Sequence, residues 1–421
     1  MRTLLAPALL VLLATASCST ATFDRASCQT DDDCAGFGTR STCDGDGYCS
    51  TADVADIEPH IGFVFSSLTS DRGWSATHQA AIRAVAEEFD APLSVREDVR
   101  NIDAAAQINE LTEEGANIIF TASSGFIGAT QQAANENPDS FFVSCCGRAS
   151  GDNLTSYFGR MYQPIYVLGY VAAKMSCTKR LGIVAAFPFP QFVRHINAFT
   201  LGARRADPDV EVDVRWVNAF FNIEDERTAA EELMDEGADV IFAQSNSSQP
   251  VEARSGATVT CDRGEGAGDE ELPVYRIGYH SPDACRFNED QCISSAHWDW
   301  TSLYRDKIQS ILDGTFDPED VDWVSMTNSP ESVVNYAALD QSGLVPGALD
   351  VEAGGIRLDA IANPQLPFVG PLSDNMGVEQ IASGQTLSDI ELDAMCYFVD
   401  GVIEGPPGAT TPRAVPPRCS E

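Results

Sequence analysis

The chain has 421 residues, of which 44% are apolar and 9% aromatic, so it is long enough for two or three domains and too apolar for a disordered acidic tail. Its 26 Lys and Arg residues stand against 63 Asp and Glu residues, a net charge of −37. This acidic excess argues against binding to the phosphate backbone, so we expect no nucleic acid partner. The charge favours solubility and identifies no ligand.

The first 18 residues resemble a bacterial lipoprotein signal. Arg2 gives a positive start, residues 4–13 are apolar, and small residues lead to Cys18. We therefore expect a lipoprotein signal peptide at 1–17 and lipidation at Cys18. Ordinary signal-peptidase cleavage is the alternative, because Thr15 stands where Leu is usual. No later stretch approaches the ~20 apolar residues of a spanning helix, so we predict a cell-envelope protein, on the periplasmic side and lipid-anchored to a membrane.

Thirteen cysteines suit an oxidising compartment. Four of them, Cys28, Cys34, Cys43 and Cys49, lie in a short segment rich in Gly and Asp. Because this segment has too few apolar residues for a core, we predict that residues 18–57 are lipid-anchored and held by disulfides. Calcium binding is the alternative, although the Asp spacing differs from that of the helix-loop-helix calcium loop. The other cysteines form neither a Cys-x-x-Cys pair nor a Cys/His cluster, so we predict no metal site and no cofactor.

From residue 58 short apolar runs alternate with helical patterns, which is typical of β/α units around a mainly parallel sheet. Strands are predicted at 61–65, 93–96, 117–121 and 140–144, and again at 181–186, 210–217, 239–243 and 274–278. Helices are predicted at 76–89, 165–175, 192–204 and 225–236.

The second half of this series repeats the first. Residues 111–124 can be laid on 233–246, and 61–64 on 181–184, so both pairs lie about 120 residues apart. We infer two similarly folded lobes. Ligands of open α/β sheets bind beyond the carboxyl ends of the strands, so facing lobes predict a cleft. The loops after the strands alternate aromatic and small polar residues, which suits a flat heterocycle with a polar rim.

Several motifs follow one another in a fixed order between about residues 61 and 403. They include Asp71-x-Gly73-Trp74-x-x-x-His78, Phe187-Pro188-x-Pro190, Gly237-Ala238-Asp239-Val240, His297-x-x-Trp300-x-x-x-Tyr304 and Gly370-Pro371-Leu372. Together they resemble the basic membrane protein (BMP) family, the lipoprotein solute-binding components of ABC importers. The resemblance implies an α/β fold of two Rossmann-like lobes of the type I periplasmic-binding kind, joined by a hinge. It also implies a purine base or nucleoside as ligand and an ABC permease in the inner membrane as partner.

The same resemblance divides the chain. The N-terminal lobe is expected over 58–178, with returning segments from about 298–330. The C-terminal lobe is expected over 179–297, with returning segments from about 331–405. Residues 406–421 form a Pro-rich tail.

Carried over by position, Trp74 and Phe220 are expected to be the rings that sandwich the base. The resemblance places the other ligand-binding candidates at Asp71, Ser123, Ser124, Phe126, Tyr162, Asn197, Asn246, His280, Asp283 and Trp300. Asp71 has helix capping as a second role, and Trp300 lies near a crossover between the lobes, where hinge packing is the alternative. Asn246 stands where relatives usually have Asp, which removes a charge-assisted acceptor for the ligand.

An exported enzyme is the rival class. The sequence has no Gly-x-Ser-x-Gly elbow, and Cys145-Cys146 does not have the setting of a reactive thiolate, so we expect no catalytic residues. A sensor domain that binds a ligand and reports to a membrane partner uses the same fold and stays open as an alternative. An insertion at 252–272 is expected to reshape the cleft rim or a partner surface.

Overall fold

The computed structural model describes residues 28–30, 41–43, 49–51, 57–261 and 269–403. The chain divides into two compact units, 1–56 and 57–421. In the first unit the short strands β1 (Ser41–Cys43) and β2 (Cys49–Thr51) pair antiparallel, and a disulfide joins Cys28 to Cys43. The predicted signal peptide, Cys18, the Asp residues considered for calcium and the Pro-rich tail lie outside the described residues.

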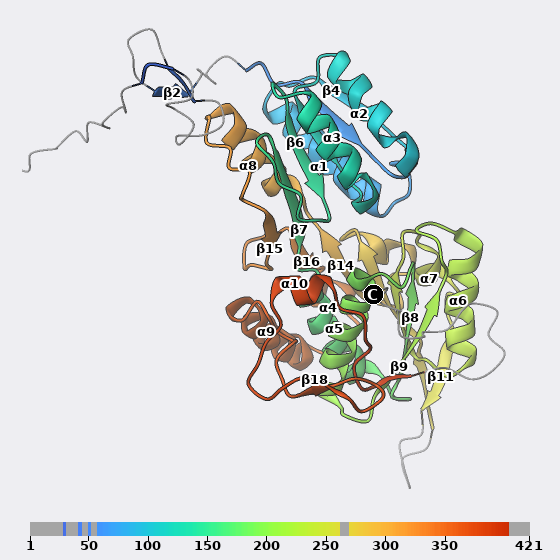
Figure 1. Cartoon of the computed structure of the whole chain (residues 1–421). Helices are drawn as coiled ribbons and strands as arrows, with labels where there is room; N and C mark the ends of the chain where they lie inside the picture. The colour runs from blue at the N-terminus through green and yellow to red at the C-terminus, as the bar shows by residue number, and fades with distance from the viewer. Residues whose placement is uncertain (1–27, 31–40, 44–48, 52–56, 262–268, 404–421) are drawn as a thin grey trace, which may run out of the picture. The chain divides into compact units, whose positions relative to one another are not determined.

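Two sheets organise the second unit (Figure 1). The first has the order β15-β7-β6-β5-β3-β4 and consists of β3 (Ile61–Val64), β4 (Leu93–Arg96), β5 (Ile118–Thr121), β6 (Phe141–Cys145), β7 (Leu154–Gly159) and β15 (Asp322–Val324), all parallel. The second has the order β16-β14-β13-β10-β8-β9-β19 and consists of β8 (Arg180–Ala185), β9 (Glu211–Trp216), β10 (Val240–Gln244), β13 (Tyr275–His280), β14 (Cys292–Trp298), β16 (Val334–Tyr336) and β19 (Val402–Ile403). Only β16 runs antiparallel to its neighbour in this second sheet.

The two sheets share one winding order. The series β6-β5-β3-β4 in the first corresponds to β13-β10-β8-β9 in the second. The strands that the sequence repeat relates, β3 with β8 and β5 with β10, therefore hold equivalent places. The predicted α/β fold with two similar lobes is confirmed.

Helices cover both sheets. They are α1 (Trp74–Glu88), α2 (Ala104–Glu113), α3 (Ile127–Glu136), α4 (Tyr162–Met175), α5 (Pro190–Ala206), α6 (Ile223–Asp235), α7 (Gln249–Glu252), α8 (Thr301–Leu312), α9 (Gly347–Ala362) and α10 (Asp389–Asp393). The predicted strands and helices all form, with bounds shifted by a few residues. Strands β7 and β14, helices α2, α3, α8 and α9 and the shorter elements were not predicted. No helix among the described residues is both long and apolar enough to span a bilayer.

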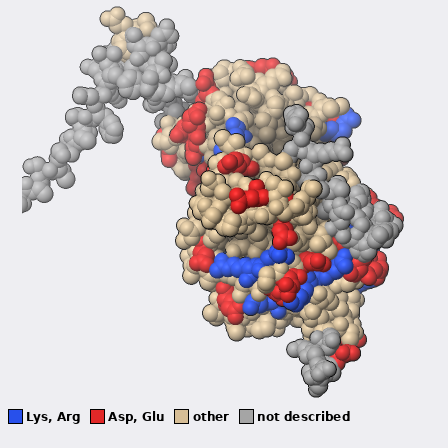
Figure 2. All heavy atoms as spheres, turned by 60° about the horizontal axis from the view of Figure 1, so that its bottom comes forward, with Lys and Arg blue, Asp and Glu red and all other residues tan. Residues whose placement is uncertain are grey.

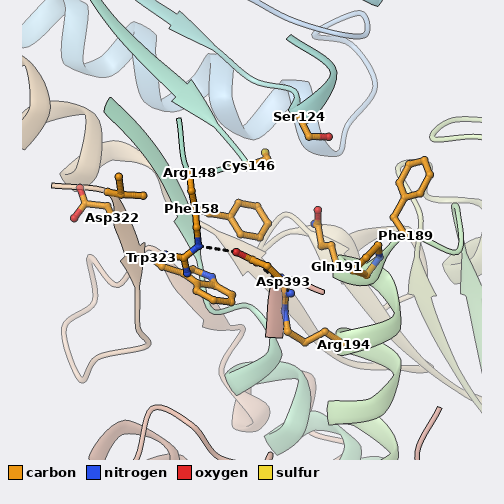
Figure 3. A pocket seen from close by; sticks show the side chains of 13 residues that line it. Ser124, Cys146, Arg148, Phe158, Phe189, Gln191, Arg194, Asp322, Trp323 and Asp393 are labelled. Carbon is orange, nitrogen blue, oxygen red and sulfur yellow. Dashed lines mark hydrogen bonds and ion pairs between the residues drawn. The ribbon is translucent and has the colours of Figure 1, made fainter. Parts of the chain in front are cut away.

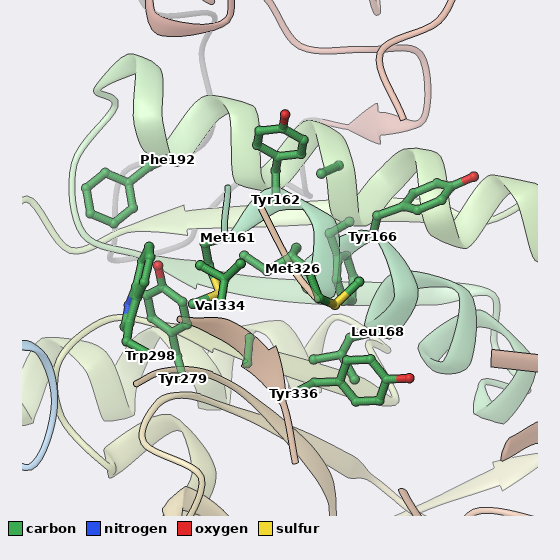
Figure 4. Packing of buried hydrophobic residues seen from close by; sticks show 14 of the residues in the cluster. Met161, Tyr162, Tyr166, Leu168, Phe192, Tyr279, Trp298, Met326, Val334 and Tyr336 are labelled. Carbon is green, nitrogen blue, oxygen red and sulfur yellow. The ribbon is translucent and has the colours of Figure 1, made fainter. Parts of the chain in front are cut away.

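The chain crosses between the lobes after β7, after β14 and after β15. Backbone hydrogen bonds hold these crossovers side by side: Arg160 N–H donates to the Val324 carbonyl over 2.8 Å, and Asp299 N–H to the Val333 carbonyl over 2.9 Å. Apolar side chains fill the space around them, among them Met161, Met326 and Val334 (Figure 4). The hinge region is therefore a packed core.

Helix α4 follows the first crossover. It lies in the residue range expected for the first lobe, yet it packs on α5 and α9 of the second. Almost every side chain of α4 is buried, which explains its unbroken apolar sequence. Glycines make the α4–α5 contact close, because a Cβ at Gly169 would overlap the Phe199 carbonyl and one at Gly202 the Tyr166 carbonyl.

The described part of the insertion includes a hairpin of β11 (Thr258–Cys261) and β12 (Glu270–Pro273). A disulfide joins Cys261 to Cys177, which lies just before the amino end of β8. The hairpin is thus held at the end of the second sheet opposite the carboxyl ends of the strands (Figure 1). This hairpin therefore does not form the cleft rim.

The chain carries 63 Asp and Glu residues against 26 Lys and Arg residues. On the face shown in Figure 2, Lys and Arg side chains lie among Asp and Glu side chains. Some of these cations form surface ion pairs, such as Lys179–Asp207 and Arg205–Asp359. Each such pair contributes little to stability, so the fold depends on its cores.

We expect Gly202→Ala to lower the free energy of unfolding by about 3 kcal/mol, because its methyl group has no space between α4 and α5. The matched control is Gly355→Ala in α9, where a Cβ meets no atom within 4 Å. That change should leave stability equal or raise it by about 0.5–1 kcal/mol. Urea unfolding followed by circular dichroism measures both. Equal stability of Gly202→Ala and the parent would contradict the close helix contact.

Candidate ligand-binding site

A pocket lies where the loops at the carboxyl ends of the two sheets face each other. The first lobe contributes Ser66, Trp74, Ala122, Ser123, Ser124 and Cys146, and the second contributes Phe189, Gln191, Phe192, Phe220, Asn246 and His280. About 60 Å³ of space remains between them, so the two walls are close together. This is the location predicted from the parallel sheets.

Half of the twelve candidate residues meet in this pocket. They are Trp74, Ser123, Ser124, Phe220, Asn246 and His280. The structure places the other six away from it: Asp71, Phe126, Tyr162, Asn197, Asp283 and Trp300. Sequence reasoning did not single out Cys146, Gln191 or Phe192. The loops after the strands were predicted to face the cleft, but nothing in the local sequence pattern shows which of their side chains point into the pocket.

The structure gives most of these six residues a structural role. Asp71 accepts hydrogen bonds from the backbone N–H groups of Gly73 (2.8 Å) and Ser75 (2.9 Å), so it caps α1 and fixes the start of the helix that carries Trp74. Phe126 is fully buried in the core beneath α3. Asp283 lines a separate cavity beside the start of α1.

The remaining three support the hinge and the C-terminal segment. The Tyr162 hydroxyl donates to the Pro364 carbonyl over 2.7 Å. The Asn197 amide donates to the Tyr397 carbonyl over 2.7 Å and accepts from the Val399 N–H over 3.0 Å. Trp300 is fully buried at the second crossover.

Trp74 is the aromatic residue of the first-lobe wall. Its indole N–H donates to the Ala122 carbonyl over 2.8 Å, which fixes the plane of the ring. The ring meets His78 edge-on at 4.2 Å and Trp298 at 5.6 Å between centroids. Trp74 therefore packs against the aromatic side chains of the hinge and also lines the pocket.

Phenylalanines form the opposite wall. Phe220 is 44% exposed and packs edge-on against Phe187, with 4.8 Å between ring centroids. Phe189 and Phe192 lie within 6.4 Å of it by the same measure. The neighbouring Phe221 is also 44% exposed but does not line the pocket. The pocket thus has an aromatic residue on one lobe facing an aromatic cluster on the other.

A chain of hydrogen bonds fixes the polar edge of the pocket. Burial lowers the pKa of His280 to about 3, so its ring is neutral at pH 7. The Trp298 indole N–H, which can only donate, lies 3.2 Å from His280 Nδ1. Nδ1 is therefore the acceptor, and the proton is on Nε2, which donates to Asn246 Oδ1 over 2.9 Å. The Asn246 amide is left to present its NH₂ group, a donor, to a ligand.

A disulfide between neighbouring residues ends β6. It joins Cys145 to Cys146, and Cys146 lines the pocket with a left-handed backbone, φ 72°. Both sulfur atoms are bonded, so neither is the nucleophile of the rival enzyme hypothesis. Among the residues that the structure describes, no three His, Cys, Asp or Glu side chains are grouped as a metal site requires.

Comparison with known proteins agrees with this architecture. The family model of PnrA-like ABC transporter substrate-binding proteins (Bmp) matches residues 58–327. A purine-binding protein of Brucella abortus is 29% identical over 360 residues, which cover 83% of this chain and 94% of that protein. A putative ABC transporter glucose-binding protein of Haloferax volcanii is 31% identical over 307 residues, 70% of this chain and 74% of that protein.

Among solved structures, an ABC transporter solute-binding protein from Conexibacter woesei aligns with a TM-score of 0.58 at 19% identity, covering 73% of this chain and 97% of that one. This likeness shows the fold. The match over residues 58–327 covers more than half of the chain and confirms the family that the sequence motifs suggested. The chain therefore belongs to the PnrA-like (Bmp) family of ABC transporter substrate-binding proteins.

Proposed function

We propose that this substrate-binding protein captures a purine base or nucleoside between its lobes and delivers it to an ABC permease in the inner membrane. The observation that carries the proposal is the pair of opposed aromatic walls, Trp74 and Phe220, with hydrogen-bonding groups at their edges. A planar heterocycle uses both kinds of contact, since its faces stack and its rim needs partners. The purine-binding relative from Brucella abortus supports the same ligand class.

In this proposal the base enters an open cleft and stacks on Trp74 and Phe220. The hydroxyls of Ser123 and Ser124 and the Asn246 amide then meet its rim. Because Asn246 presents a donor, the ligand edge that faces it carries an acceptor, a ring nitrogen or a carbonyl oxygen. Closure of the lobes about the three crossovers buries the base, and the closed form is what a permease recognises.

We further propose that lipid at Cys18 anchors the protein on the periplasmic side of the envelope. The signal pattern of residues 1–18 supports this step. The anchor keeps the binding unit next to its permease at high effective concentration. The same anchored unit also suits the sensor hypothesis, in which the closed form is read by a different membrane partner.

Thermal-shift and calorimetric measurements with purine bases, purine nucleosides and glucose test the ligand. We expect at least one purine to raise the melting temperature and glucose to leave it unchanged. Glucose is the informative alternative ligand, because a putative glucose-binding protein is similar over much of the chain. Stabilisation by glucose with none by any purine would overturn the ligand class and leave the family membership intact.

We expect Phe220→Ala to weaken binding of the active purine by about tenfold or more, because stacking on an aromatic ring contributes about 1–3 kcal/mol per base. Phe221→Ala is a closely matched control, since Phe221 is adjacent and equally exposed but lies outside the pocket. Its binding constant should equal that of the parent. Calorimetry gives both constants, and equal losses in the two variants would refute a specific stacking role for Phe220.

Asn246→Asp should weaken binding of the same purine by about tenfold, because a carboxylate accepts where the amide donates and faces the acceptor of the ligand. The carboxylate also lies beside His280 and should raise the pKa of its ring. Calorimetry at pH 6 and pH 8 measures the affinity, and NMR titration of the imidazole measures the pKa. Unchanged affinity at both pH values would exclude Asn246 as a ligand donor.

Gly73→Ala tests whether the close approach of Gly73 to Asn246 across the cleft is needed for binding. A Cβ at Gly73 would lie 2.5 Å from the Asn246 carbonyl oxygen, across the cleft. We expect the methyl group to hold the lobes apart and to weaken purine binding by about tenfold without lowering the melting temperature of the free protein. Gly128→Ala, where a Cβ meets nothing within 4 Å, is the control. Normal binding by Gly73→Ala would show that closure to this distance is unnecessary.

A further inference from the structure

A second cavity adjoins the base pocket (Figure 3). It encloses about 430 Å³, far more space than remains in the base pocket itself. Four residues line both spaces: Ser124, Cys146, Phe189 and Gln191. A ligand whose ring lies on Trp74 and Phe220 can therefore extend into the second cavity past these four side chains.

Three guanidinium groups surround one indole ring at this cavity. The guanidinium carbons of Arg148, Arg160 and Arg194 lie 5.3, 4.5 and 4.9 Å from the centroid of Trp323. The residues come from the turn after β6, the first crossover and helix α5. Such a grouping of like charges needs compensation, and it indicates a site with a purpose beyond packing.

The compensation comes from two carboxylates of helix α10. Asp389 lies 2.8 Å from Arg160, and Asp393 lies 2.9 Å from Arg148 and 3.5 Å from Arg194. A third carboxylate in the wall, Asp322, lies 2.9 Å from Lys307, which also lies 3.0 Å from Asp320. Around Trp323 three guanidinium groups thus face the two carboxylates of α10.

The hydrogen-bond donors exceed the acceptors in the same way. Three guanidinium groups carry five N–H groups each, whereas the two carboxylates already accept from them. Arg194 is only 2% exposed, and within the described part of the chain neither its Nε nor the Trp323 indole nitrogen has a hydrogen-bond partner. Burial lowers the pKa of Arg194 to about 10, so the group still carries its charge at neutral pH.

These features distinguish between ligand classes. A sugar ring needs acceptors as well as donors, and here the arginines already engage the two carboxylates of α10, although Ser124 and Gln191 also carry acceptor oxygens in the wall. An anion supplies acceptors and charge together, and the fork of a guanidinium matches phosphate and carboxylate oxygens. We propose that the second cavity binds an anionic phosphate or carboxylate group carried by the ligand whose ring occupies the base pocket. The inference rests on the proposed function and specifies the substrate as an acidic purine derivative.

The test compares a purine base, its nucleoside, its nucleoside 5′-monophosphate and a purine carboxylate by calorimetry on the full chain. We expect the monophosphate or the carboxylate to bind about tenfold tighter than the base, with an advantage that shrinks as NaCl rises. The two acidic ligands separate phosphate from carboxylate as the preferred group. Arg148→Gln should remove this advantage and leave binding of the free base within about twofold.

Arg205→Gln is the matched control. Both arginines have side chains that are 40% exposed and form ion pairs with carboxylates, but Arg205 pairs with Asp359 and does not line the cavity. Binding of every ligand should be unchanged in this variant. If the base binds but neither acidic derivative binds more tightly, the anion site is refuted and the purine pocket stands. If no purine binds at all, both the proposed function and the anion site are refuted.

Discussion

Burial of the His280 imidazole between Trp298 and Asn246 is the constraint on which the polar edge of the pocket depends. With its pKa held at about 3, the ring is neutral and has one donor and one acceptor. Trp298 uses the acceptor, so the donor must bind Asn246 and orient its amide. The position of the His280 proton thus fixes which group Asn246 presents to the pocket.

The same aromatic cluster joins the cleft to the hinge. Trp298 and Trp300 stack at 4.7 Å around the second crossover, Trp300 stacks on His78 at 4.6 Å, and Trp74 meets both tryptophans edge-on. Because β14 belongs to one lobe and α1 to the other, rotation of the lobes has to move these rings against one another. Packed interiors accommodate such motion in discrete arrangements, and Trp74 belongs both to this packing and to the wall of the pocket.

Local patterns predicted most of the fold. Strands such as β5 and β10 are short, fully buried and bounded by polar turns, and their repeat carries the two-lobe architecture. Strand β7 was missed because Thr155, Ser156 and Gly159 break the apolar run, and their burial depends on partners distant in sequence. The site was harder for the same reason. Tyr162 and Asn197 have the polar groups of ligand contacts, and only the tertiary structure directs them to Pro364 and Tyr397.

The second cavity could not be predicted from the sequence. Arg148 and Asp393 are 245 residues apart, and each alone resembles an ordinary surface charge. Their meeting depends on the turn at Cys146, which carries the chain from β6 to Arg148, and on α10, which lies beyond residue 327, where the family match ends. The ring pocket is thus built within the matched region, while the carboxylates that balance the arginines come from outside it. The two spaces share the side chains of Ser124, Cys146, Phe189 and Gln191, so a ligand that occupied both would meet these four at the junction.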